Sequence, residues 1–218
     1  THGYGHAARQ AAVLIELHRL RPDWQLVISS GVDETFLDLV LRDLPVSRRT
    51  VRWDVGMLQA DALGVDEQAT LRALQKLEIE LPKLVQREVD WIRQQNSPCV
   101  VLGDIPPAAA ELARQLEAPL LWMGNFGWDE IYGPLGGPFL AWADKATSAY
   151  QRGALLLRCP FSLAMNWSLP ERALGLVSAD PEPLPSDLEG RLLADGRAKV
   201  LVGFGGLGFP LAPELFTS

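Results

Sequence analysis

The residues with the clearest potential for chemistry are two histidines near the start of the chain, His2 and His6, in the sequence THGYGHAAR of residues 1–9. Gly3 and Gly5 allow the backbone to turn tightly and to approach a ligand closely. The helical pattern that follows offers unpaired N–H groups and the positive end of a helix dipole. Because histidine transfers protons near neutral pH, this stretch predicts an active-site loop between a strand and a helix. We expect the strand to lie before the first residue.

Four interpretations of this loop compete. Gly3-x-Gly5-x-x-Ala8 fits a dinucleotide-binding pattern, but Ser29-Ser30 stands where that pattern expects a ribose-binding acid. A metal site at His2 and His6 has no obvious third ligand. A Gly-rich turn with exposed or capping histidines is the third interpretation. The fourth is general-base chemistry, since a helix dipole favours the neutral, proton-accepting form of a nearby histidine.

The rest of the chain alternates buried strands with helices of 10–15 residues, as the spacing of its apolar residues shows. Strands are predicted at 24–29, 50–54, 99–103, 118–123 and 154–158, and helices at 6–20, 34–44, 66–92, from 106 onward and at 139–152. We expect Pro82 to kink or divide the long third helix. This alternation predicts an α/β fold with a Rossmann-like, open and mostly parallel sheet and helices on both faces.

Polar residues gather where the predicted strands end, which is the edge at which open α/β sheets bind ligands. Besides the first loop, they are Ser30, Asp54, Asp104, Asn125, Trp128 and Asp129. A carboxylate such as Asp104 could orient a histidine ring and stabilise its protonated form. It could equally cap the helix that follows. The convergence of these side chains favours a binding or catalytic site.

Composition narrows the possible classes of protein. The net charge of −7 argues against a nucleic-acid-binding surface. No apolar run reaches the ~18 residues of a membrane helix, and no signal peptide is recognisable, so we expect a cytoplasmic protein. Cys99 and Cys159 lie in apolar, strand-like runs, which favours buried free thiols over a disulfide.

The prolines between 160 and 190 predict a change in organisation. We expect a Rossmann-like domain over residues 1–160, a linker or crossover over 161–196, and the first strand and Gly loop of a second domain over 197–218. The remainder of that second domain is expected to follow residue 218.

Several segments resemble the N-terminal domain of GT-B-type glycosyltransferases, in particular the glycosyltransferase-like domain found in bacterial proteins and ahead of the kinase in plant L-arabinokinase. The similar segments are residues 2–9, 54–63, 88–92, 103–109, 124–132 and 199–206. The resemblance implies two Rossmann-like domains with the active site between them. The N-terminal half would bind a sugar or glycan acceptor, and the C-terminal half would bind a nucleotide-diphosphate sugar as co-substrate, with no other cofactor and no metal.

The resemblance also implies roles for individual residues. His6 would deprotonate the acceptor hydroxyl with support from Asp104, which lies 98 residues later (104 − 6). The acceptor pocket would be formed by His2, Gly3, Gly5, Ser30, Asp54, Asn125, Trp128 and Asp129, and the donor phosphates would meet Gly205 and Gly206. The chain alone would be inactive, because its donor-binding partner is its own C-terminal domain. The alternative is a non-catalytic sugar-binding or regulatory module.

Overall fold

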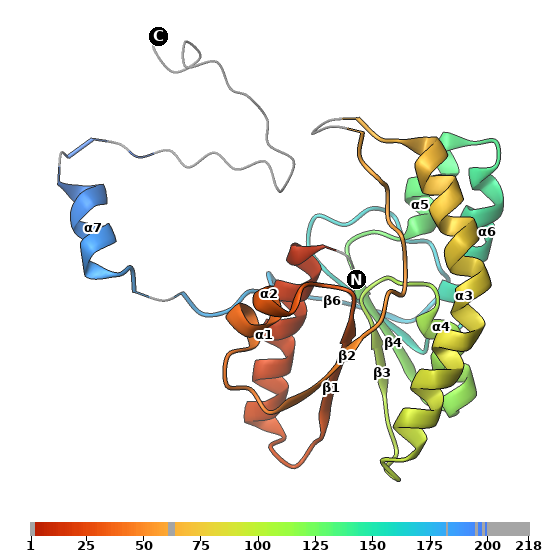
Figure 1. Cartoon of the computed structure of the whole chain (residues 1–218), viewed down its shortest axis with the longest axis horizontal. Coiled ribbons are helices and arrows are strands. Elements are labelled where there is room, and N and C mark those ends of the chain that lie inside the picture. The colour runs from red at the N-terminus through yellow and green to blue at the C-terminus, as the bar shows by residue number, and fades with distance from the viewer. Residues whose placement is uncertain (1–2, 61–63, 182, 195, 198, 200–218) are drawn as a thin grey trace. The chain divides into compact units, whose positions relative to one another are not determined.

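The computed structural model describes residues 3–60, 64–181, 183–194, 196–197 and 199 (Figure 1). His2, Gly205 and Gly206 therefore lie outside the described residues. The chain divides into two compact units. The first consists of Thr1–Gly56 and Gln68–Ala179, and the second of Met57–Glu67 and Asp180–Ser218. The domain boundaries expected near 160 and 196 stay predictions.

The strands of the first unit are all parallel, which confirms the predicted α/β class. In one sheet, β1 (Leu26–Ser30) pairs with β2 (Val46–Thr50). The other sheet has the order β3-β4-β5-β6 and is formed by β3 (Val101–Gly103), β4 (Leu120–Gly124), β5 (Leu155–Arg158) and β6 (Glu171–Ala173). Parallel neighbours need long crossovers, and helices supply most of them.

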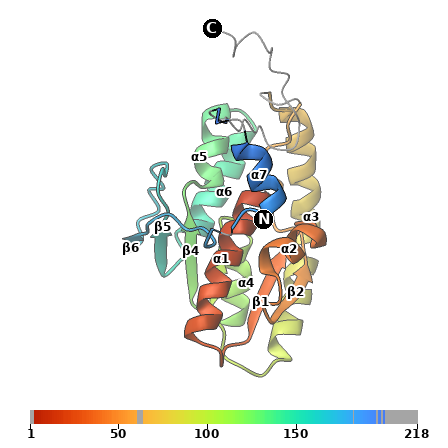
Figure 2. The same ribbon diagram turned by 90° about the vertical axis from the view of Figure 1, so that its left-hand side faces the viewer.

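Helices lie on both sides of the strands (Figures 1 and 2). On one side, α1 (Tyr4–Leu20) packs on α2 (Glu34–Leu41). Ala7 and Ala11 of α1 share one hydrophobic cluster with Ile28 of β1. The opposite side carries α3 (Glu67–Arg93), α4 (Ala109–Leu116), α5 (Trp128–Tyr132), the short 3-10 helix η1 (Gly133–Leu135) and α6 (Phe139–Tyr150). The second unit contains α7 (Ser186–Leu193).

The second predicted strand is misplaced. β2 ends at Thr50, where the prediction began. Val51 N still donates to the Ser30 carbonyl of β1 at 3.1 Å, but residues 51–54 form no strand. Val51 and Trp53 are nevertheless buried in a cluster with Val85 and Val89 of α3. The alternating apolar residues are therefore buried here without forming a strand. In the sequence, burial in a strand and burial outside a strand give the same pattern.

Other differences concern continuity and short elements. α3 runs as one helix through Pro82, so the proline does not divide it. The sequence did not predict α5, β6 or α7, which have only 5, 3 and 8 residues. β6 lies inside the segment expected to be a linker, and its three residues are all exposed, so they carry no apolar pattern.

The helix α1 lies across both sheets. Its Ala7 and Ala11 pack with Ile28 of β1, while its Gln10 contacts Asp104 and Met123 at the end of the other sheet. The two sheets therefore lie beside each other under one helix, although β1 and β3 are not hydrogen-bonded neighbours. This arrangement brings the start of α1 to the carboxyl ends of β3 and β4.

Two further expectations from the sequence concern the cysteines and membrane-spanning helices. Cys99 and Cys159 are both free thiols, but only Cys159 is buried, and Cys99 is partly exposed. Among the helices that the structure describes, none is long and apolar enough to cross a membrane.

Candidate functional site

The centre of the candidate site is the carboxylate of Asp104, which is buried directly after β3. Its Oδ1 lies 2.8 Å from Nδ1 of His6 and 2.5 Å from Nη2 of Arg9. Its Oδ2 accepts hydrogen bonds from Arg9 Nε at 3.2 Å and from Gln10 Nε2 at 2.8 Å. Three side chains from the first two turns of α1 thus converge on one carboxylate.

The contacts of His6 indicate which ring nitrogen carries the proton. A carboxylate only accepts, so Nδ1 donates its hydrogen to Asp104. Arg9 Nη2 lies 3.1 Å from the same nitrogen, but a guanidinium only donates, so that approach is a contact and no hydrogen bond. With the proton on Nδ1, the lone pair belongs to Nε2. This is the tautomer in which a histidine can accept a proton from a substrate.

The negative charge of Asp104 is balanced by the positive charge of Arg9. Burial alone would raise the pKa of Asp104, but the hydrogen bonds from His6 and Arg9, together with the positive charge of Arg9, outweigh it and lower that pKa. Burial would lower the pKa of Arg9, and Asp104 reverses this and raises it. Asp104 is therefore ionised at neutral pH and shares its charge with Arg9. Arg9 also donates to Asn125 Oδ1 at 3.3 Å.

The backbone after Asp104 is strained. Ile105 has a φ of 66° although it is β-branched and precedes a proline. Its carbonyl accepts a hydrogen bond from the Tyr150 hydroxyl at 2.8 Å, and the same hydroxyl accepts one from Trp128 N at 3.0 Å. Such strain persists where the surroundings enforce it and is enriched at functional sites. Here the strained residue lies directly after Asp104.

The other predicted site residues fall into separate groups. Asn125 joins the central cluster through Arg9. Asp54 and Trp128 form a second, buried pair, in which Trp128 Nε1 donates to Asp54 Oδ2 at 3.1 Å. The carboxylate of Asp129 instead accepts from Trp167 and Thr147, at 2.9 and 3.3 Å, and so helps to hold neighbouring elements.

The first loop is more helical than predicted. α1 begins at Tyr4, so Gly5 and His6 lie in its first turn, and Gly3 is its N-cap with a φ of −107°. The glycines therefore do not adopt a left-handed turn. A Cβ atom on Gly3 would lie 3.2 Å from His6 Cδ2, which indicates that Gly3 leaves room for the imidazole. The Oγ of Ser30 accepts from the backbone N of Val32 at 3.1 Å.

Sequence reasoning missed Arg9 and Gln10, although a signal was present. Residues three and four apart on a helix lie on the same face, and Arg9 and Gln10 follow His6 at these spacings. Such a face offers several hydrogen-bond donors and one positive charge, which suit an acidic partner. Tyr150 gave no such signal, because its contact with Ile105 depends on the packing of α6.

Comparison with known proteins gives one informative similarity. Over 132 residues the chain is 30% identical to L-arabinokinase of Arabidopsis thaliana. The match covers 60% of this chain but only 12% of the relative, so the chain spans about an eighth of that protein's length. No model of a known protein family matches the chain, and no solved structure matches it.

Proposed function

We propose that this chain is the acceptor-binding half of a nucleotide-sugar-dependent glycosyltransferase, in which His6 is the general base. The observation that carries the proposal is the 2.8 Å contact between His6 Nδ1 and Asp104 Oδ1, which joins residues 98 positions apart. The similarity to a protein named for a sugar, L-arabinose, supports a carbohydrate ligand. Asn125 and the buried Asp54–Trp128 pair would border the acceptor.

The proposed chemistry is a proton transfer coupled to glycosyl transfer. The acceptor hydroxyl gives its proton to Nε2 of His6, and its oxygen forms a bond to the anomeric carbon of the donor sugar. The bond between that carbon and the diphosphate breaks, and the nucleoside diphosphate leaves with the electron pair. Asp104 stabilises the imidazolium that forms, because its ionised carboxylate already accepts the Nδ1 hydrogen.

The test compares His6→Ala with His18→Ala in the complete natural polypeptide that contains this sequence. Hydrolysis and transfer are measured with UDP-, GDP- and dTDP-sugars. Loss of a general base lowers turnover by about 10²–10⁴-fold. His18 is a matched control because it lies in the last turn of the same helix, about 18 Å from His6 at 1.5 Å per residue. Normal turnover in His6→Ala would disprove the base assignment.

A second candidate function is a non-catalytic sugar-binding or regulatory module. The observation that favours it is the bidentate hold of Arg9 on Asp104, supplemented by Gln10. A carboxylate that already neutralises an arginine stabilises an imidazolium less than a carboxylate without such a partner. This function predicts sugar binding to the complete polypeptide with no hydrolysis or transfer of any of these donors.

A further inference from the structure

The crossover between β5 and β6 differs from the other crossovers of the first unit. Each of the other connections contains at least one helix: α2 follows β1, α3 follows β2, α4 follows β3, and α5 and α6 follow β4. Residues 159–170, which connect β5 to the parallel strand β6, contain no helix. The sheet face that a crossover helix would cover is therefore covered by a loop, which we call the 159–170 loop.

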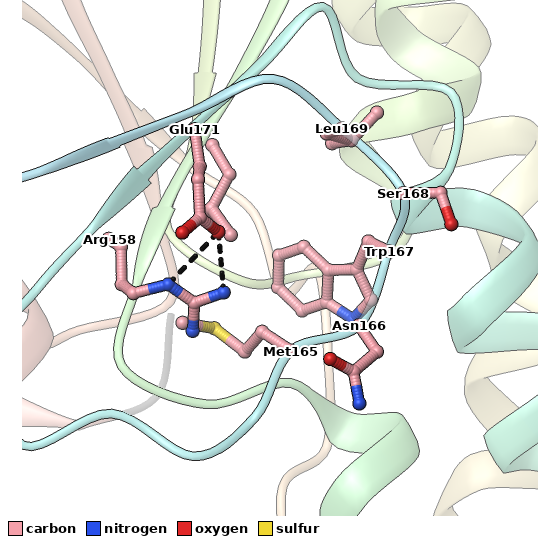
Figure 3. A pocket seen from close by; sticks show the side chains of 8 residues that line it. Arg158, Met165, Asn166, Trp167, Ser168, Leu169 and Glu171 are labelled. Carbon is pink, nitrogen blue, oxygen red and sulfur yellow. Dashed lines mark hydrogen bonds and ion pairs between the residues drawn. The ribbon is translucent and has the colours of Figure 1, made fainter.

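Beneath this loop lies a hollow of about 270 Å³. Leu156 of β5 and Trp167 contribute apolar surface, and Arg158 and Glu171 contribute charged groups. Figure 3 shows the ion pair between Arg158 and Glu171 with the ring of Trp167 beside it. One face of that ring stacks on Tyr150 with centroids 4.0 Å apart. Trp167 is therefore a fixed wall of the hollow.

The hollow and the His6 cluster lie on opposite faces of the sheet. Paired residues of neighbouring strands point to the same face, and successive residues point to opposite faces. Leu156 of the hollow pairs with Trp122 and with Glu171, whereas Met123 pairs with Leu157. Gln10 of α1 contacts Met123, so α1 and His6 occupy the Met123 face. The hollow is thus a separate place in the molecule.

The 159–170 loop is strained and firmly held. Phe161, Met165 and Ser168 all have positive φ, at 57°, 44° and 57°, which costs conformational energy for residues other than glycine. Met165 N donates to Glu130 Oε1 at 2.7 Å, and Leu163 N donates to the Asn125 carbonyl at 2.8 Å. These bonds hold a shape that the loop would not prefer by itself. The hollow is therefore formed before any ligand binds.

The polar groups of the hollow are electrically balanced. Arg158 donates from Nε and Nη2 to Glu171 Oε2, at 3.1 and 2.7 Å, and from Nη1 to Ser162 Oγ and the Leu163 carbonyl. At least four of the five guanidinium hydrogens are thus engaged. An anion would have to displace Glu171. Both bonds to Glu171 end on Oε2, so Oε1 takes no part in the ion pair and can accept from a hydroxyl group.

Size and chemistry together define a class of ligand. The volume is just below the ~300–1,000 Å³ range of typical small-molecule pockets, which favours a ligand smaller than a nucleotide or a disaccharide. A carboxylate oxygen, the amide of Asn166 and an apolar wall suit a compact ring that carries several hydroxyl groups. We propose that the hollow under the 159–170 loop binds one neutral monosaccharide or cyclitol, independently of the His6 site.

The test is an NMR titration of the ¹⁵N-labelled chain with D-galactose, D-glucose, L-arabinose and myo-inositol. The reporter is the indole N–H of Trp167, assigned with Trp167→Phe. We expect this resonance to shift with a dissociation constant of about 1 mM for at least one probe. The indole of Trp24, which is exposed beside Arg21, should not move. Inorganic phosphate is titrated as the anionic comparison.

Variants separate this site from the His6 site. Glu171→Gln should weaken binding about tenfold, because it removes a charge-assisted acceptor, and Asn166→Ala should also weaken it without altering the core. Arg172→Gln is the matched control, since Arg172 is the next residue of β6 and pairs with Leu157, so it points to the opposite face. His6→Ala should leave binding in the hollow unchanged, even if it abolishes the proposed transferase activity.

Three results would overturn the proposal. The first is a Trp167 resonance that none of the four neutral probes shifts at 20 mM or so, well above the expected dissociation constant of about 1 mM. The second is an equal loss of binding in Arg172→Gln and Glu171→Gln. The third is tighter binding of phosphate than of every neutral probe, which would make the hollow an anion site.

Discussion

Arg9 is the residue that most changes the interpretation of the His6–Asp104 pair. An aspartate that serves only a histidine leaves its whole charge available to the imidazolium, but this one shares it with a guanidinium. Arg9 also reaches Asn125, so it connects the ends of β3 and β4 to α1. The same residue therefore builds the site and limits how strongly Asp104 can support a base.

The strained turn at Ile105 gives a prediction at the scale of single residues. Tyr150 is fully buried, and burial raises the pKa of its hydroxyl well above the usual value, so the group stays neutral and donates to the Ile105 carbonyl. Tyr150→Phe leaves this carbonyl and the Trp128 N–H without their partner. We expect a loss of about 2–3 kcal/mol in the free energy of unfolding, measured by urea denaturation.

The control for this variant is Tyr4→Phe. Tyr4 is 58% exposed, so the loss of its hydroxyl should change the free energy of unfolding by less than about 0.5 kcal/mol. If Tyr150→Phe were as stable as Tyr4→Phe, the Tyr150 hydroxyl would not be what holds the turn at Ile105.

At the scale of elements, a buried ion pair connects β2 to α3. Arg49 donates to both oxygens of Glu88, at 2.9 and 2.8 Å, and its guanidinium lies 4.5 Å from the ring centroid of Trp91. Glu88 is only 1% exposed. Without Arg49, the buried carboxylate of Glu88 keeps only the exposed Arg87 as a cationic partner, so most of the compensation of its charge is lost. We expect Arg49→Met to lower the free energy of unfolding by about 3 kcal/mol, measured by urea denaturation.

Arg87 offers a matched comparison, because it contacts the same carboxylate at 3.1 Å while its side chain is 53% exposed. Arg87→Met should cost less than about 1 kcal/mol, as is usual for exposed ion pairs. Equal losses in the two variants would show that burial of the Arg49–Glu88 pair is not what matters.

The strand expected before His6 stays a prediction. The arrangement of the two sheets is consistent with such a strand. β1 and β3 lie beside each other under α1 without being hydrogen-bonded neighbours. Apolar residues lie on most sides of α1, yet the buried residues of this helix are Ala7 and Ala11. A further parallel strand between β1 and β3 would join the two sheets and cover more of this helix.

At the scale of the whole molecule, acid should weaken the fold through Asp104. Its pKa in the folded chain lies below its ordinary value, which is ~3.9 in an unfolded chain. A lowered folded pKa contributes stability above pH ~4 that is lost as the pH falls toward the folded pKa. We therefore expect Asp104→Asn to be less stable than the wild type at pH 7. The difference should shrink steadily between about pH 5 and pH 3, as followed by thermal unfolding.

Glu111 provides the comparison at the surface. Its hydrogen bond with Arg114 lowers its pKa to about 2, although burial acts in the opposite direction. The side chain is 39% exposed, so solvent screens its contribution to less than about 1 kcal/mol. Glu111→Gln should therefore differ little from the wild type at any pH. A constant difference between wild type and Asp104→Asn would contradict the role given to the Asp104 charge.

The sequence by itself determined the order of the main elements and the α/β class, and it supplied candidates for proton transfer. These properties are local, since apolar periodicity and composition act over a few residues. His6 and Asp104 were both candidates because each stands at the end of a predicted element. Their spacing along the chain said nothing about the distance between their atoms.

Only the tertiary structure decided which candidates meet and which do not. Packing of α1 across two sheets brings Arg9 and Gln10 to the carboxylate, and the position of α6 lets Tyr150 fix Ile105. Asp129, whose place in the site stays a prediction, accepts a hydrogen bond from Trp167 and has no contact with the His6 cluster among those described. The hollow beneath the 159–170 loop exists because a crossover lacks a helix. Contacts of this kind join residues far apart in sequence, so local patterns carry no record of them.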